Sequence, residues 1–459
     1  MLFSSIPFLY YFLPAVLIAY FLVPRKLKNA VLFVSSLVFY GWGEPKLLFL
    51  MIFTVALFFF CGLAIERSEK NKRLWLTASV VISLALLGIF KYADFFIGSI
   101  NAVTGLGLPF LRLALPVGIS FYTFQCLSYT IDVYRGNVPA QRDPIVFGTY
   151  VALFPQLIAG PIVRYADIAR ELEQRQTTWD DVYTGLRRFL VGLSKKVLLA
   201  DSFALLVQLY RESREPSVLF AWLYAIAFGF QIYFDFSGYS DMAIGLGRIF
   251  GFRFIENFNY PYLSRSITEF WRRWHMSLGS WFRDYVYIPM GGNRVSKKRW
   301  VLNILTVWML TGLWHGAAWN FVLWGLLYAV FLLLEKGMPG LQKLPALLRH
   351  GYTMLVVLLG FVLFNAESLS QAGSDFAAMF GFGGLPAVTA HTLYCLRSFG
   401  VLLAVACLGA TPVPKKAALA LEKYRFAPIL TLFLLAAALV VSTAFLVDGS
   451  FSPFLYFRF

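Results

Sequence analysis

Long apolar segments follow one another along most of this chain, and they leave few ways for it to fold. A helix that crosses a bilayer needs about 20 mostly apolar residues, and about eleven segments reach or approach that length. They are residues 6–23, 29–43, 47–65, 74–90, 113–131, 145–162, 218–235, 301–334 (one broken helix or two tightly connected ones), 351–366, 393–410 and 427–447. The segments 93–108 and 183–208 are helical in pattern but more polar, so we expect re-entrant or interfacial helices there. The chain is therefore predicted to be an all-α, polytopic integral membrane protein.

Composition and charge agree with a protein of the bilayer. Only 14% of the residues are charged, against about 25% in soluble domains. The net charge is +16, and the basic residues lie mostly in short connections such as "RKLK" at 25–28 and "ERSEKNKR" at 66–73. The positive-inside rule places these two connections in the cytoplasm and the N-terminus outside. Such basic connections suit anionic lipid headgroups, and we do not expect a nucleic-acid partner.

The four cysteines predict no disulfide framework and no metal site. They are scattered through apolar sequence without paired spacing, at Cys61, Cys126, Cys395 and Cys407. Buried cysteines of this kind behave as small hydrophobic residues. The four histidines include no HExxH pattern, so we do not expect a catalytic metal either.

Two acidic residues stand in strongly apolar sequence. Asp235 and Asp241 occur in "FQIYFDFSGYSDMAIGLGRIFGF", at 230–252. An acidic side chain at this depth is costly, so it usually faces a cavity or a charged partner. The pair could belong to a functional site, or it could form ion pairs with Arg248 or Arg253 that only hold helices together. The sequence leaves both interpretations open.

The segment 264–288 is predicted to form an amphipathic helix rich in tryptophan and arginine. Ser266 and Glu269 have the spacing of a capping box, and Glu269 and Arg273 can pair on one helical face. His275 lies within this segment. A helix of this composition suits the membrane interface or the rim of a cavity. An interfacial anchor without chemistry stays an alternative.

A glycine turn and a basic cluster follow, as "GGNRVSKKR" at 291–299. Its spacing is not that of a phosphate-binding loop. The cluster could attract an anionic ligand such as a phosphorylated thioester carrier, or it could simply mark the cytoplasmic side.

His315 stands in the apolar run "TVWMLTGLWHGAAWN", at 306–320. A neutral imidazole needs no counter-ion at such depth, and it can accept a proton as a general base. Gly312 and Gly316 have the small-xxx-small spacing that allows a helix or a ligand to come close. The alternative is a structural histidine whose ring nitrogens are satisfied by a backbone carbonyl and by Asn320 or Thr311. Residue chemistry alone predicts a buried polar site around His275 and His315.

Two motifs in order resemble one known family. "FWRRWHMSLGSWFRDYVYIPMGGNR" at 270–294, followed by "LTGLWHGAAWNFVLWG" at 310–325, is similar to the membrane-bound O-acyltransferase family, and most similar to its bacterial polysaccharide branch. "FYGWGEPKLL" at 39–48, "LPVGISFYTFQCLSYTIDVYRG" at 115–136 and the segment around Asp235 agree with it. The resemblance runs over nearly the whole chain, and the order and spacing of the motifs make it specific.

The resemblance implies a ring of membrane helices around a central tunnel, in a single polytopic domain over residues 1–459. Peripheral helices would occupy about 1–110, the catalytic core about 111–335, and the C-terminal helices about 336–459. His315 would be the general base that deprotonates an acceptor hydroxyl, and His275 would orient the donor thioester or polarise its carbonyl. The supporting residues around them would be Trp314, Asn320, Asp235 and Asp241. The candidate contacts to the donor's phosphates are Arg272, Arg273, Arg294 and Lys298.

The resemblance also implies a reaction. An acetyl group would leave a cytoplasmic thioester, with acetyl-CoA as the expected donor substrate and no permanently bound cofactor. It would cross the bacterial inner (cytoplasmic) membrane to a periplasmic partner of the SGNH, serine-hydrolase-like class. The final acceptor would be an exported exopolysaccharide such as alginate. Direct attack and a covalent acetyl-enzyme both remain open.

Three other functions stay open. One is the transfer of D-alanyl or other acyl groups to a cell-envelope polymer, since the D-alanyl transfer members of the family have a helix similar to "WHMSL". A glycan transporter or flippase would instead use His315 in a proton path, with Asp235 and Asp241 as relays. The sequence has no internal repeat, which counts against a transporter of two-fold symmetry. A structural scaffold of an export complex would leave both histidines inert.

Overall fold

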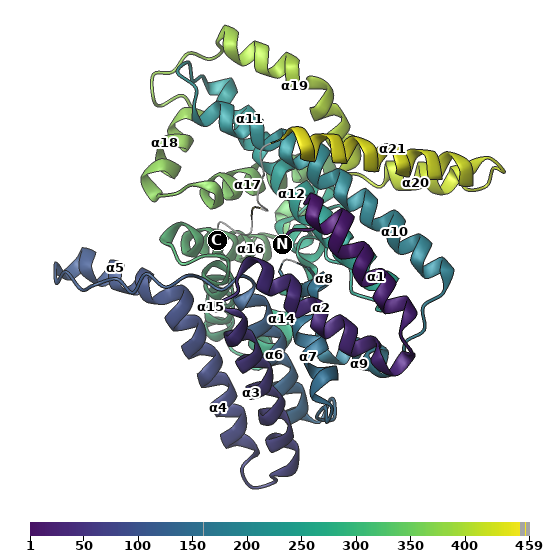
Figure 1. Cartoon of the computed structure of the whole chain (residues 1–459). Coiled ribbons are helices and arrows are strands. Elements are labelled where there is room, and N and C mark those ends of the chain that lie inside the picture. Colours follow the sequence, from purple (N-terminus) through teal and green to yellow (C-terminus); the bar gives the residue numbers. More distant parts are fainter. Residues whose placement is uncertain (159, 450–454, 456–459) are drawn as a thin grey trace. The chain divides into compact units, whose positions relative to one another are not determined.

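All regular structure in the described part of the chain is helical. The structure, a computed structural model, describes residues 1–158, 160–449 and 455 (Figure 1). The prediction of an all-α chain is therefore confirmed for these residues. The helices form two compact units, which are described separately below. Unit 1 comprises Met1–Phe189 and Tyr239–Ile255, and unit 2 comprises Leu190–Gly238 and Glu256–Phe459. The single domain over the whole chain stays a prediction.

Unit 1 contains the N-terminal helices. Its elements are η1 (Phe8–Phe12), α1 (Leu13–Leu22), η2 (Arg25–Leu27), α2 (Lys28–Gly43), α3 (Leu48–Arg67), α4 (Lys72–Leu87), η3 (Gly88–Tyr92), α5 (Ala93–Thr104), α6 (Ile119–Arg135), α7 (Pro144–Ala152), α8 (Phe154–Leu157), α9 (Tyr165–Gln174) and most of α10 (Trp179–Ser194). Helices α3 and α4 run side by side (Figure 1), and α6 packs against both. A fully buried aromatic cluster joins segments that are distant in the sequence. Within it, the ring centroids of Phe3 and Phe8 lie 4.9 Å apart, and those of Phe39 and Phe154 lie 5.5 Å apart.

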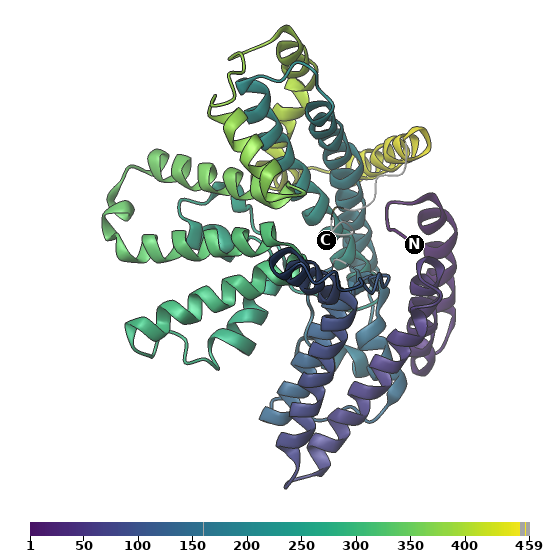
Figure 2. The ribbon, with the colours of Figure 1, turned by 90° about the vertical axis from the view of Figure 1, so that its left-hand side faces the viewer.

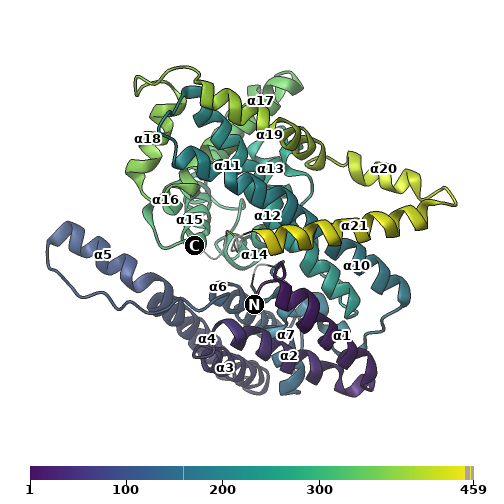
Figure 3. The same cartoon turned by 45° about the horizontal axis from the view of Figure 1, so that its top comes forward.

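Unit 2 contains the remaining helices. They are η4 (Lys195–Ala200), α11 (Asp201–Arg211), the first part of α12 (Val218–Ile249), η5 (Pro261–Leu263), α13 (Ile267–Arg273), α14 (Met276–Phe282), η6 (Arg283–Tyr287), α15 (Lys297–His315), α16 (Trp319–Gly337), η7 (Pro339–Lys343), α17 (Ala346–Asn365), α18 (Leu369–Met379), α19 (Ala390–Gly409), α20 (Val413–Leu421) and α21 (Ala427–Asp448). The chain reverses between α20 and α21 (Figure 3). Most of α21 is exposed and apolar, as expected of a helix that faces lipid.

Seven of the described helices are long and apolar enough to cross a membrane, judged by length and composition. They are α3, the continuous helix Lys72–Thr104, α12, α16, α17, α19 and α21, and the apolar helix Phe8–Leu22 is shorter. These spans support the predicted polytopic membrane protein. The segment 301–334 consists of two helices, α15 and α16. The segment 145–162 is interrupted at Leu153, after which Pro155 occupies the first turn of α8, where its missing N–H is tolerated.

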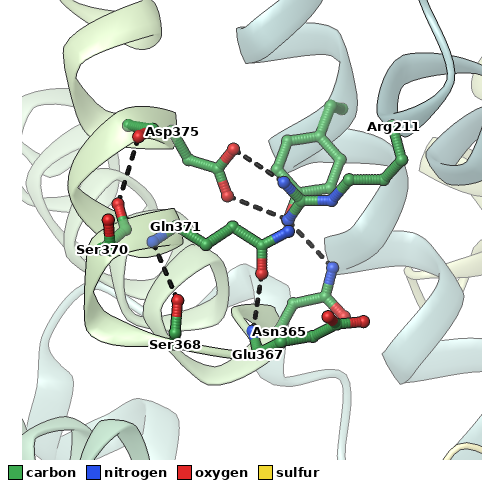
Figure 4. Close-up of polar contacts among 9 residues, drawn as sticks. Arg211, Asn365, Glu367, Ser368, Ser370, Gln371 and Asp375 are labelled. Carbon is green, nitrogen blue, oxygen red and sulfur yellow. Dashed lines mark hydrogen bonds and ion pairs between the residues drawn. The ribbon is translucent and has the colours of Figure 1, made fainter.

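An ion pair fastens α18 to α11 within unit 2 (Figure 4). The guanidinium of Arg211 donates to both carboxylate oxygens of Asp375, at 2.7 and 2.9 Å, and it also donates to the hydroxyl of Tyr224. Asn365, the last residue of α17, donates to the same hydroxyl at 2.9 Å. The side chain of Asp375 is only 6% exposed. A bidentate pair of this kind fixes orientation as well as distance.

Replacing Arg211 by leucine is therefore expected to destabilise unit 2. The substitution leaves the carboxylate of Asp375 buried without its cation, which costs about 3 kcal/mol. The double variant Arg211→Leu/Asp375→Leu removes both charges and is expected to recover most of that loss. Thermal unfolding of the purified protein measures both effects, with the exposed Arg214→Leu as the matched control. Equal melting temperatures for the single variant and the wild type would contradict the expectation.

Candidate functional site

The hairpin of α15 and α16 positions His315. A Cβ added at Gly312 would collide with the carbonyl oxygen of Phe321, and one added at Gly325 would collide with that of Trp308. Only glycine permits such a close approach of two backbones, so the small residues set the distance between the helices. The predicted close approach at Gly312 is thus confirmed, and the approaching element is α16. The two helices are seen in green in Figure 2.

His315 ends α15 inside an aromatic cage. It is 5% exposed. Its ring centroid lies 5.0 Å from that of Trp314, 5.0 Å from that of Trp324 and 5.4 Å from that of Phe364. All three contacts are edge-to-face, an arrangement that aromatic rings prefer. The cage holds the imidazole in one place and excludes bulk water from it.

His275 lies at a break between two short helices. The predicted continuous helix over 264–288 is wrong, because α13 ends at Arg273 and α14 begins at Met276. His275 has φ +46° and ψ +51°, in the left-handed region, which is uncommon for a residue other than glycine. Strain of this kind persists only where the surroundings enforce it, and it occurs often at functional sites. The expected start of the helix is confirmed, since Ser266 caps α13 by accepting from the Glu269 N–H at 3.0 Å.

Asn257 holds His275 in its conformation. Its side-chain oxygen lies 3.2 Å from Nδ1 of His275, and it accepts from the Ser277 N–H at 3.2 Å and the Ser277 hydroxyl at 2.9 Å. Its backbone carbonyl accepts from the Met276 N–H at 3.0 Å. Since a backbone N–H can only donate, the atom facing His275 is an acceptor, and Nδ1 must carry the proton.

His275 is therefore a neutral imidazole with a basic Nε2. The residue is 1% exposed, and this burial lowers its pKa. With the proton on Nδ1, the lone pair of Nε2 accepts hydrogen bonds. The edge-to-face ring of Phe236, with its centroid 4.7 Å away, covers the imidazole from α12.

The structure brings the two predicted histidines together. The ring centroids of His275 and His315 lie 6.2 Å apart, and Trp314 contacts both, with centroid distances of 5.7 and 5.0 Å. Trp314 thus lies where the sequence analysis expected a supporting residue. Both imidazoles are buried, so a reaction between them would proceed away from bulk water.

Three buried hydrogen-bond donors lie on the same aromatic cluster. They are the indole N–H groups of Trp271 and Trp324 and the hydroxyl of Tyr328, and none has a hydrogen-bond partner among the described residues. The Trp324 ring lies 5.5 Å from that of Trp271 and 5.3 Å from that of Tyr328, and it also contacts His315. A buried donor without a partner costs about 1–3 kcal/mol. Such groups suggest a ligand with acceptor oxygens.

Asn320 and the two aspartates have other partners than those expected. Asn320 donates to the Ala366 carbonyl at 2.8 Å. Asp235 pairs with the buried Lys196 at 2.9 Å and accepts from the Leu455 N–H at 2.8 Å. Asp241 belongs to unit 1 and pairs with Arg188 at 2.9 Å.

The ion pairs of these aspartates agree with a structural role. Arg248 and Arg253 were the possible partners expected from the sequence, and this was wrong for Arg248, which pairs with Asp181 at 3.2 Å. The actual partners, Lys196 and Arg188, come from a helical segment that precedes α12 by more than twenty residues. No short-range pattern connects those segments, so the pairing could not be predicted.

The four basic candidates for donor binding lie on the surface of unit 2. Arg272, Arg294 and Lys298 are exposed. Arg273 is half-buried, pairs with Glu269 at 2.9 Å as expected and donates to the Asn259 carbonyl at 3.1 Å. No hydrogen bond joins any of the four to His275 or His315 in the described part of the chain, and their contact with a donor stays a prediction.

Sequence reasoning did not single out Asn257, Trp271 or Tyr328. Asn257 stands in an irregular loop, "ENFNYPYL", where no periodicity marks its side chain. Trp271 and Tyr328 were visible as aromatic residues of apolar helices, but only the structure shows that their donors are buried without partners.

Comparisons with known proteins place the chain among acyltransferases. A family model described as membrane-bound O-acyltransferase matches residues 34–366, which include both histidines. The probable alginate O-acetylase AlgI of Azotobacter vinelandii is 46% identical over 393 residues, covering 83% of this chain and 79% of that protein. The probable alginate O-acetylase AlgI of Pseudomonas putida is 41% identical over the whole of both chains. The peptidoglycan O-acetyltransferase of Helicobacter pylori is 34% identical, with 84% of this chain and 81% of that protein covered.

Proposed function

The chain belongs to the membrane-bound O-acyltransferase family, and from this premise we propose that it takes an acetyl group from cytoplasmic acetyl-CoA for the O-acetylation of an exported polysaccharide. The observation that carries the proposal is the pair of buried histidines 6.2 Å apart within one aromatic cage. Alginate is the polymer that the names of two relatives, those of Azotobacter vinelandii and Pseudomonas putida, suggest.

His315 acts as the general base in this proposal. Its imidazole takes the proton of the acceptor hydroxyl, and the oxygen attacks the carbonyl carbon of the thioester. The carbon–sulfur bond then breaks, and the leaving thiolate recovers the proton from the imidazolium. Before the reaction, the three rings of the cage keep bulk water away from the imidazole. General-base catalysis of this kind contributes about 10²–10⁴-fold.

His275 orients the donor. Because Asn257 fixes the proton on Nδ1, the neutral ring offers an acceptor at Nε2 and cannot donate to a carbonyl oxygen from that atom. Of the two roles expected from the sequence, orientation of the thioester donor is therefore preferred to polarisation of its carbonyl. Accepting a hydrogen bond from an amide N–H of the donor would serve that purpose.

The carbonyl oxygen of the thioester needs donors as it becomes an oxyanion. We assign this part to the indole N–H of Trp324, whose ring contacts that of His315, with Trp271 and Tyr328 as neighbouring donors. These groups are already desolvated and without partners, so they are available when negative charge develops. Fixed donors in a site without bulk water are the usual means of stabilising an oxyanion.

The finer features of the family complete the proposal. The membrane helices form a ring around a central tunnel, and the protein lies in the bacterial inner membrane. A periplasmic SGNH-type acetyltransferase receives the acetyl group and passes it to the polymer. The seven candidate spans support a polytopic protein of this kind.

The proposal is tested by incubating the purified protein with acetyl-CoA labelled in the acetyl group, with and without the periplasmic partner. We expect loss of the thioester or transfer of the label, and we expect either to depend on His315. A glycan transporter or flippase would consume no acetyl-CoA. Parallel incubation with a D-alanyl thioester carrier separates acetyl from D-alanyl transfer.

Asn257 is expected to act through His275 as a positioning residue. Asn257→Ala removes the acceptor that holds Nδ1, and we expect kcat/KM for the donor to fall by about tenfold or more, since small misplacements cost that much. Asn257→Asp keeps the acceptor but adds a negative charge beside Nδ1, which raises the pKa of His275. The neutral ring is the active form, and a ring with a higher pKa becomes protonated sooner as the pH falls. On acidification, the variant is therefore expected to lose activity at a higher pH than the wild type does.

Measured pH–rate profiles check both parts of this expectation. The exposed Asn259→Ala serves as the control in the same loop. If Asn257 has only a structural role, its substitution changes the amount of folded protein but does not shift the acidic limb of the pH–rate profile. That result would contradict the positioning role.

A further inference from the structure

A cavity of about 850 Å³ lies in unit 1, apart from any residue of the proposed reaction. Its walls come from the connection between α1 and α2, the start of α7 and the end of α9 together with the residues that follow it. Five basic residues line it: Arg25, Lys26, Lys28, Arg170 and Arg175. Only two acidic residues do, Asp143 and Glu173. The basic connection at 25–28 is the one that the positive-inside rule assigns to the cytoplasm.

The positive charge of this cavity is not compensated within the protein. None of the five basic residues forms an ion pair with any residue in the part of the chain that the structure describes. Asp143 accepts from the N–H groups of Ile145 and Val146, which makes it the cap of α7. Burial, followed by the charges of Arg175 and Arg25, lowers the pKa of Lys28. Like charges held around one cavity call for an anion.

Arg175 is held rigidly at this cavity. Its Nε donates to the Tyr20 hydroxyl at 3.0 Å and one terminal nitrogen donates to Oδ1 of Asn29 at 2.6 Å. The guanidinium also lies over the ring of Phe252, 4.5 Å from its centroid. The other terminal nitrogen is buried and has no hydrogen-bond partner among the described residues. A fixed guanidinium contributes a permanent positive charge to the lining of the cavity, which favours an anionic ligand.

The surface next to the cavity is apolar. Phe21, Leu22 and Leu27 flank the basic connection and are 44%, 80% and 50% exposed. In a membrane protein, such side chains lie against acyl chains, while basic residues beside them reach the headgroups. The cavity is thus placed where a lipid phosphate would be available.

We propose that this cavity is a binding site for the phosphate group of a phosphorylated ligand at the cytoplasmic face. Two sources share this chemistry, the headgroup of an anionic phospholipid and the phosphates of a soluble nucleotide-type thioester donor. The exposed apolar neighbours favour the phospholipid. The inference does not depend on the proposed acyl transfer, because it concerns residues that the reaction does not use.

Binding measurements on the full-length protein in detergent test the site. The probes are short-chain phosphatidylglycerol and coenzyme A, with short-chain phosphatidylcholine as the neutral reference. The variant Arg25→Gln/Arg170→Gln removes two exposed cations that line the cavity, and it is not expected to impair folding. Lys70→Gln/Arg73→Gln removes two exposed cations of unit 1 that do not line it, as the matched control.

We expect the dissociation constant for phosphatidylglycerol to rise about 25-fold in the cavity variant, because a basic residue near an anionic headgroup contributes about fivefold. The control is expected to bind like the wild type. If coenzyme A instead shows the selective weakening, the phosphate site stands and its source is the soluble donor. Equal binding by both variants for both probes, or equal weakening in the control, would overturn the inference.

Discussion

Replacing His315 by alanine is expected to lower polymer acetylation by about 10²–10⁴-fold, the contribution of a positioned general base. The side chain ends α15 and is enclosed by three aromatic rings, so its position is fixed by the packing around it. The effect should fall on kcat, because the proton is transferred in the transition state. Acetyl groups on the polymer, released by mild alkali and quantified, give the measurement.

Folding has to be separated from catalysis in this experiment. The variant opens a space in the cage, so its expression and melting temperature are measured beside its activity. His391→Ala is the matched control, since His391 belongs to unit 2 and its ring contacts Phe220 rather than the cage. Normal acetylation by a folded His315→Ala protein would show that the assigned role is wrong.

Replacing Trp324 by phenylalanine is expected to lower kcat by about 10²–10³-fold, the usual cost of losing one oxyanion donor. Phenylalanine keeps an aromatic ring between His315 and Tyr328 but removes the indole N–H. In the free protein that N–H is buried without a partner among the described residues, so its removal relieves an unfavourable burial. The part of the indole that is lost leaves a small cavity, and the two effects on stability oppose each other.

The combination of a large loss in kcat with little change in stability distinguishes an oxyanion donor from a packing residue. Trp308→Phe is the matched control, because its ring packs against Trp271 and Tyr328 in the same cluster and does not contact His315. A Trp324→Phe protein with normal kcat would remove Trp324 from the mechanism and leave the role of His315 standing.

The lengths of the apolar segments predicted the all-α fold class, because a helix that crosses a bilayer needs about 20 mostly apolar residues. The interruptions of helices were harder to predict. Residues 301–334 read as one broken or two tight helices, and the break after His315 depends on the close contact of Gly312 with Phe321. The break at His275 had no marker in the sequence, because a histidine with a positive φ is enforced by Asn257 and not by local propensity.

The candidate site was predictable as two histidines with Trp314 beside them. Their motifs could be recognised, but the 6.2 Å between their rings follows from tertiary packing of α13, α15 and α16. Asp235 and Asp241 show the opposite case. Their depth left a functional site and structural ion pairs both open, and the structure pairs them with Lys196 and Arg188, both distant in sequence.

We propose that acetyl groups enter from a cytoplasmic thioester through the site of His315. Inside-out membrane vesicles from cells that express the protein and its periplasmic partner expose the cytoplasmic face to added acetyl-CoA. With label in the acetyl group, we expect alkali-labile label to accumulate on polysaccharide inside the vesicles with the wild type and not with His315→Ala. Equal accumulation with the two proteins, or none with a folded wild type in the presence of partner and polymer, would contradict it.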